Sequence, residues 1–151
     1  MSTNSNVVIL YPDKTVKVIY VHWDGNPDFV GKVLQEYYPT YKRVKRLIEL
    51  GDISVLRPNF SKPPTHSFDK PIENYTVFYG RDRGDEGCEA RHYASLDEYL
   101  STIWDSSIEY TYIYSMFTNE YGFIDVNSDD ITIQSLSNYF AMKNINIEKK
   151  F

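Results

Sequence analysis

Alternation of apolar and polar residues predicts a β-hairpin near the start of the chain. Val7 to Leu10 is an apolar run, and Pro12-Asp13-Lys14 has the composition of a turn. The next run, Thr15 to Trp23, alternates with the period of a strand. One face of this strand would carry Val16, Val18, Tyr20 and His22, and the other Lys17, Ile19, Val21 and Trp23. We therefore predict two paired strands over residues 7–23.

After this strand, the apolar residues recur at helical spacing. Asp24 or Asn26 can cap a helix that has Pro27 in its first turn, and Pro39 ends it. We expect Trp23 to be largely buried at this entrance. A second helix, 41–50, is capped by Thr40 and ends at Gly51. Its inward face would consist of Val44, Leu47 and Ile48.

Residues 57–71 contain four prolines and no clear period. They also carry Phe60, His66 and Phe68, which suggests a long ordered loop rather than a linker. We call this segment the flap. Long loops inside compact domains are frequently functional.

The second half of the chain alternates between short strands and helices. Strands are expected at 75–79, 89–93, 108–117 and 123–126, and helices over 96–104 and up to Met142. Ser95 would cap the first of these helices, and Asp129 or Asp130 the second.

The pattern as a whole predicts one α+β domain over residues 7–142. Its mostly antiparallel sheet would have four to five strands, accompanied by three to four helices. We expect residues 1–6 to be disordered and residues 143–151 to form a frayed tail.

Charge excludes one class of partner and favours another. The net charge is −5, and eight acidic residues but no Lys or Arg lie between Tyr93 and Met142. Contact with phosphates requires clustered Lys and Arg, so we do not expect general nucleic-acid binding. The acidic C-terminal half suits a basic partner instead. Tyrosine, with 14 residues, is abundant enough to supply a binding surface as well as a core.

The single cysteine, Cys88, excludes an internal disulfide. No apolar run reaches membrane-spanning length, and the polar start lacks the pattern of a signal peptide. We expect a cytoplasmic protein with neither a membrane association nor a bound cofactor.

The first candidate site is His22 with Asp24, which His66 and Asp69 from the flap could join. An imidazole beside a carboxylate can act as a base, an oriented donor or a pair of metal ligands. The spacing of the plausible metal ligands is not diagnostic, and no metal site is predicted. These ligands are His22, Asp24, His66, His92 and Cys88. The alternative is structural: His22 ends a strand and Asp24 caps a helix.

The second candidate site is the charged stretch 80–87, which contains Arg81, Asp82 and Arg83. Its guanidinium groups could bind phosphate or carboxylate in bidentate fashion. The spacing is not that of a phosphate-binding loop. A solvated hairpin turn with self-paired charges is an equal alternative.

A third candidate is the strand over 108–117, in which Tyr110, Tyr112 and Tyr114 share one face beside Glu109. An aromatic strip rimmed by carboxylates would suit a partner that presents Arg or Lys. Alternatively, the tyrosines pack under helices as core. The chain has no GxSxG or HExxH signature, which favours a binding protein over an enzyme.

Three motifs stand out as a set: His22-Trp23-Asp24-Gly25-Asn26-Pro27, Leu50-Gly51-Asp52-Ile53-Ser54 and Tyr79-Gly80-Arg81-Asp82-Arg83-Gly84. Together they resemble a family of small uncharacterised bacteriophage and prophage proteins. The resemblance covers about residues 18–100, and Asn26 stands where that family usually has Tyr. It implies a viral origin and an accessory role in the host cytoplasm, and it supplies no catalytic residue.

The leading hypothesis is a phage accessory protein, of the anti-defence kind, that binds and inhibits a host protein with a basic surface. The alternative is a small nucleotide-binding or hydrolytic protein that uses His22, Asp24, Arg81 and Arg83. Convergence of these four side chains in one pocket would distinguish the two. The sequence does not fix the oligomeric state.

Overall fold

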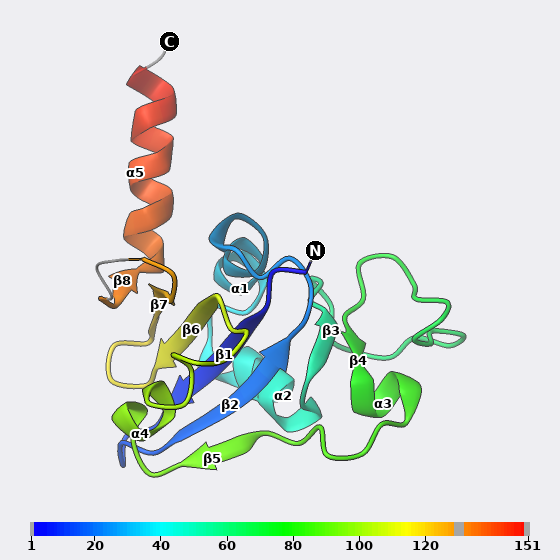
Figure 1. Cartoon of the computed structure of the whole chain (residues 1–151). Helices are drawn as coiled ribbons and strands as arrows, with labels where there is room; N and C mark the ends of the chain where they lie inside the picture. The colour runs from blue at the N-terminus through cyan, green and yellow to red at the C-terminus, as the bar shows by residue number, and fades with distance from the viewer. Residues whose placement is uncertain (1, 129–131, 150–151) are drawn as a thin grey trace.

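The computed structural model describes residues 2–128 and 132–149, which form a mixed sheet with helices on both faces (Figure 1). The strands are β1 (Ser5–Leu10), β2 (Val16–Val21), β3 (Ile53–Val55), β4 (Val77–Phe78), β5 (Arg91–Tyr93), β6 (Tyr110–Ser115), β7 (Glu120–Asp125) and β8 (Gln134–Ser135). The helices are the π-helical turn η1 (Pro27–Gly31), α1 (Lys32–Tyr37), α2 (Tyr41–Leu50), α3 (Tyr79–Arg83), α4 (Leu96–Leu100) and α5 (Leu136–Lys149).

The strand order is β4-β3-β2-β1-β6-β7-β8, and β5 pairs with the free edge of β2. The pairs β1–β6 and β2–β3 are parallel, and the other strand pairs are antiparallel. The predicted class, a single mixed α and β domain, is confirmed. Within the described residues the sheet has eight strands rather than the four to five predicted. The unpredicted β3 and β8 are too short to show an alternating pattern.

The predicted hairpin is confirmed, with Val7 opposite Ile19 and Leu10 opposite Val16. Its first strand begins earlier than expected, because Ser5 pairs with β2 on one side and with β6 on the other. Ser5 is fully buried, and Thr3 accepts a hydrogen bond from a distant backbone N–H. The prediction that residues 1–6 are disordered is therefore wrong for this part of the chain.

The two faces of the sheet support separate cores. Alternate residues of β1 and β2, such as Ile9 and Ile19, pack under α1 and α2 with Leu34 and Leu47. The intervening residues, such as Val18, pack on the opposite face against α4 and the turn that follows it. Because the sheet is covered on both sides, its central strands are apolar on both faces.

Helix α2 forms as predicted. The Thr40 side chain accepts a hydrogen bond from the Arg43 N–H, and Val44, Leu47 and Ile48 are buried. Gly51 ends the helix at φ 88°, a conformation that favours glycine. A side chain at this position would also collide with the backbone carbonyl of Cys88.

Helix α5 begins at the buried Leu136 and extends away from the sheet (Figure 1). It continues to Lys149, seven residues beyond the end predicted at Met142, and the fraying of this tail stays a prediction. No Gly or Pro interrupts this stretch, which explains why the helix does not end at Met142. The proposed caps Asp129 and Asp130 lie outside the described residues. No helix in the described part of the chain is long and apolar enough to cross a membrane.

Candidate functional site

The junction between β2 and η1 holds its backbone tightly. The His22 and Trp23 N–H groups donate to carbonyls of β3, and the Gly25 N–H donates to Thr3. The Tyr112 hydroxyl donates to the Gly25 carbonyl at 2.7 Å. A Cβ on Gly25 would lie 2.6 Å from the Thr3 carbonyl oxygen, so only glycine allows this close approach. Residues 22–25 are therefore fixed from several sides.

Two sequence-based expectations about this junction are wrong. Trp23 is 43 % exposed rather than largely buried. Asp24 is exposed, adopts φ 57° and uses its backbone carbonyl, not its carboxylate, to accept from the Val30 N–H. Asn26 precedes the first turn without a side-chain cap bond. Backbone hydrogen bonds close the π-helical turn, so neither the Asp24 nor the Asn26 side chain caps it.

His22 is oriented by its neighbours in sequence. Its Nδ1 lies 2.7 Å from the Tyr20 hydroxyl, which is two residues earlier on the same face of β2. The Trp23 indole packs edge-on against the imidazole, with 4.7 Å between ring centroids. The two aromatic rings therefore restrain each other at the end of the strand.

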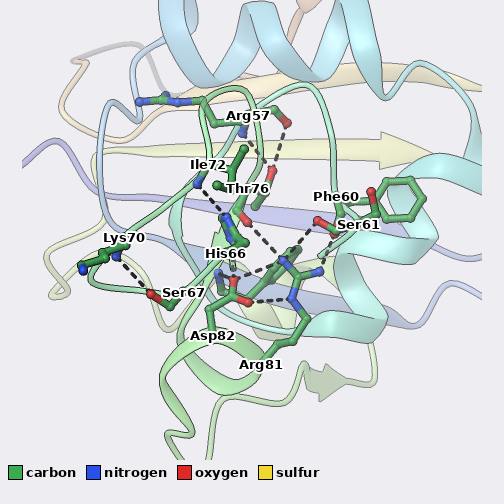
Figure 2. Close-up of polar contacts among 11 residues, drawn as sticks. Arg57, Phe60, Ser61, His66, Ser67, Lys70, Ile72, Thr76, Arg81 and Asp82 are labelled. Atoms are coloured by element: carbon green, nitrogen blue, oxygen red, sulfur yellow. Dashed lines mark hydrogen bonds and ion pairs between the residues drawn. The ribbon is translucent and has the colours of Figure 1, made fainter. Parts of the chain in front are cut away.

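Arg81 fastens the flap to the body of the protein (Figure 2). Its Nη1 donates to the Phe60 carbonyl at 2.5 Å, and its Nη2 donates to the Thr76 carbonyl at 3.2 Å. Its Nε donates to Asp82 Oδ1 at 2.9 Å. Each nitrogen of this guanidinium is therefore already bonded to the protein. Arg81 thus serves as a structural clamp.

Asp82 lies at the centre of the same cluster, with a fully buried carboxylate. Oδ2 accepts from the Phe78 N–H at 2.8 Å, which holds the start of α3. Burial raises the pKa of Asp82, but the bonds from Arg81 and from the Phe78 N–H lower it more, so the net pKa lies below its ordinary value. The charged stretch predicted as a turn is helical for this reason, and it ends at Gly84 in a left-handed conformation.

His66 is a buried residue of the flap itself (Figure 2). Its Nδ1 accepts from the Ile72 N–H at 2.9 Å, so the neutral ring carries its proton on Nε2. Nε2 lies 3.4 Å from Asp82 Oδ2, a polar contact that does not meet the geometry of a hydrogen bond. Both ring nitrogens face the protein interior, so His66 pins the flap and is not open to a ligand.

Arg83 forms an exposed two-point ion pair with Asp85, with distances of 2.9 and 2.7 Å. Hydrogen bonding to Asp85 raises the pKa of Arg83. The guanidinium also lies 4.2 Å from the centroid of the Phe68 ring. The self-paired charges of the alternative are found for Arg83, but the predicted hairpin turn is not, because residues 79–83 form α3.

The four side chains of the small-molecule hypothesis do not act together. Among the described residues, no hydrogen bond, ion pair or ring contact joins His22 or Asp24 to Arg81 or Arg83. Within the same part of the chain, no group of three or more His, Cys, Asp or Glu side chains is placed to hold a metal ion.

The proposed tyrosine surface on β6 is wrong. Tyr112 and Tyr114 are buried under the helices, and Tyr110 packs partly against the same core. Burial raises the pKa of Tyr112. The Glu109 backbone is used on both sides, donating to Asn4 and accepting from Val126. These residues belong to the core because β6 lies in the middle of the sheet.

Sequence reasoning missed the pair formed by Asp52 and Arg91, which is joined by two hydrogen bonds of 2.6 Å each. Asp52 is buried and also accepts from the Tyr20 N–H at 2.8 Å. The hydrogen bonds that Arg91 donates to Asp52 raise the pKa of Arg91. The partners are far apart in sequence, and no local signal connects them.

In comparisons with known proteins, no family model, curated protein or solved structure matches the chain.

Proposed function

We propose that the chain is a protein-binding accessory factor of phage origin that occupies the surface of a host protein and inhibits it. The phage origin rests on the resemblance of three sequence motifs. The binding role rests on the junction between β2 and α1, which we call the junction surface and define as residues 22–29.

The observation that carries the proposal is the exposure of two large aromatic side chains in this segment. Trp23 is 43 % exposed and Phe29 is 56 % exposed. Trp and other aromatic residues dominate the energetics of protein interfaces. A single exposed apolar residue needs no explanation, but two within seven residues on a fixed backbone form a candidate anchor.

Rigidity strengthens this interpretation. The Gly25 N–H is bonded to Thr3, the Gly25 carbonyl to Tyr112, and the Asp24 carbonyl to the Val30 N–H. The His22 ring limits the movement of the Trp23 indole. An anchor that is ordered before binding loses less conformational entropy when the complex forms.

Charge indicates the kind of partner. Asp24 is exposed beside Trp23 and has no salt bridge within the described residues. An aromatic ring next to a carboxylate suits a partner that presents Arg or Lys, since cation–π and ionic attraction then act together. We therefore propose a host protein with a basic surface.

The small-molecule alternative that uses His22, Asp24, Arg81 and Arg83 has less support, because its two arginines are bonded to the flap and to Asp85. Binding an anion would require breaking these contacts.

The chain offers a matched control for the test. Trp104 is 45 % exposed and Phe117 is 58 % exposed, close to the values for Trp23 and Phe29. The double variant Trp23→Ala with Phe29→Ala is compared with Trp104→Ala plus Phe117→Ala in tagged pull-downs from host extract. We expect the first variant to lose at least about tenfold in captured partner and the second to keep it. Equal capture by both variants, at unchanged melting temperatures, would contradict the proposal.

A further inference from the structure

A hollow of about 220 Å³ opens on the face of the sheet opposite α1 and α2. Strands β1, β2 and β5 form its floor, and α4 with the turn that follows forms one wall. The buried residues Val18, Ile103 and Tyr99 close its back, the half-buried Tyr93 supplies a ring, and Asn6 and Arg91 supply polar groups. None of these residues belongs to the junction surface.

The aromatic wall is held in place. Tyr93 and Tyr99 meet at 63°, with 5.5 Å between their centroids. The Tyr99 hydroxyl accepts from Asn6 Nδ2 at 2.9 Å and lies 3.0 Å from Thr111 Oγ1. The buried Tyr99 is therefore fixed, and it supports the Tyr93 ring before any ligand arrives.

Three polar groups of the lining retain hydrogen-bonding capacity. Arg91 spends both Nη groups on Asp52, and its Nε–H has no partner within the described residues. Asn6 uses Nδ2, while its Oδ1 has no bond to the described part of the chain. The Tyr93 hydroxyl likewise makes no bond there. The hollow thus offers a donor, an acceptor and a hydroxyl.

The hollow is also electrically neutral. Arg91 is its single charged lining residue, and that charge is matched by Asp52. A phosphate would find no uncommitted cation, and an ammonium group would find no free carboxylate. A ligand that carries a net charge is therefore disfavoured.

We propose that this hollow binds a neutral heterocycle of nucleobase size, as a free base or a nucleoside. The volume lies below the roughly 300 Å³ at which pockets for drug-sized ligands begin, which limits the ligand to one or two rings. Nucleobases carry donors and acceptors side by side on their edges. They also stack on aromatic side chains, whatever their identity. This inference does not depend on the junction surface binding a protein.

The test is a calorimetric titration of the whole chain with adenosine, guanosine, cytidine and uridine, each beside its 5′-monophosphate. We expect at least one nucleoside to bind with a Kd between about 1 µM and 1 mM. Its monophosphate should bind at most about threefold more tightly than the nucleoside itself. No binding of any nucleoside at about 10 mM, or binding that requires the phosphate, would overturn the proposal.

Blocking variants locate the site. Thr102 is an exposed residue of the lining, and Thr102→Tyr should fill the hollow and weaken binding by about tenfold or more. The neighbouring Ser101 is also exposed but does not line the hollow, so Ser101→Tyr should bind like the wild type. Equal binding by both variants places the ligand elsewhere and refutes the assignment. Should Thr102→Tyr fail to fold, amide shifts in the wild type decide: changes at Asn6 and Tyr93 support the site, and their absence during binding refutes it.

Discussion

Arg91 and Asp52 face each other through two hydrogen bonds of 2.6 Å, although 39 residues separate them in sequence. The pair lies where β2 stops pairing with β5, at Val18, and begins pairing with β3, at Val21. Between these points Asp52 Oδ1 accepts the Tyr20 N–H. A carboxylate thus takes the place of a backbone acceptor at the gap in the sheet.

The first prediction concerns this gap. Asp52→Ala should lower the free energy of unfolding by roughly 2–3 kcal/mol, because it leaves the Tyr20 N–H and the Arg91 guanidinium without an acceptor. Arg91→Gln should cost only about 1 kcal/mol, since Arg91 is partly exposed and Asp52 keeps the backbone bond. Urea denaturation measures both values. Equal losses would show that the Tyr20 bond contributes little.

The second prediction concerns acid stability. The pKa of Asp82 is lower in the folded state than its ordinary value of 3.8. Its ionised form therefore stabilises the fold above about pH 4, and this contribution is lost as the pH falls through the lowered pKa. Asp82→Asn should be less stable at neutral pH yet lose less stability on acidification. Denaturation midpoints at about pH 7 and about pH 3 check this, and an undiminished acid loss in Asp82→Asn would count against it.

The third prediction concerns alkaline stability. Burial raises the pKa of Tyr99 from 10.0 to about 12, against the smaller opposing effect of its hydrogen bonds to Thr111 and Asn6. Its contribution is fully present below pH 10 and is lost as the pH rises towards 12, by roughly 2–3 kcal/mol in total. Tyr99→Phe should therefore show a smaller alkaline loss than the wild type. Thermal unfolding between these two pH values gives the comparison, and identical slopes would be inconsistent with the account.

The fourth prediction concerns the flap. Arg81→Gln removes the bonds to the Phe60 and Thr76 carbonyls, so the flap should open more often. Chymotrypsin should then cleave after Phe60 and Phe68 about tenfold faster or more, given the strength of charged hydrogen bonds. Lys45→Gln is the control, because the ion pair of Lys45 with Glu49 is exposed and involves no flap residue. Similar cleavage of the two variants would remove Arg81 from this role.

Local signals in the sequence were sufficient for part of the fold. The hairpin follows from alternation around Pro12, and α2 follows from its Thr40 cap and its apolar face. Both depend on residues close in sequence, where spacing and capping chemistry act directly.

The pairing of strands that lie far apart in sequence could not be predicted in the same way. The period of 2 placed Tyr110, Tyr112 and Tyr114 on one face of β6 correctly, but it could not show that helices cover both faces of that strand. The parallel pairing of β1 with β6 joins residues about a hundred positions apart. A strand that is buried on both faces lacks the alternation of apolar and polar residues that distinguishes a core face from a solvent face.

The candidate site shows the same limit. Arg81, Asp82 and His66 carry the chemistry of an anion or proton-transfer site, but their partners are backbone carbonyl and N–H groups, which every stretch of chain carries. Trp23 lies outside the core, and two residues further on the Gly25 N–H is bonded to the Thr3 carbonyl near the start of the chain. Neither the partners of these side chains nor the exposure of Trp23 can be predicted from residue types alone.

The most direct test of the binding role is photocrosslinking from single positions. A benzophenone amino acid replaces Phe29 in one variant and Phe117, which has nearly the same exposure, in another. Each variant is expressed in the host and irradiated. The account predicts a discrete crosslinked host protein from position 29 and none from position 117. A crosslink from position 117 alone, or none from position 29 in a folded variant, would contradict it.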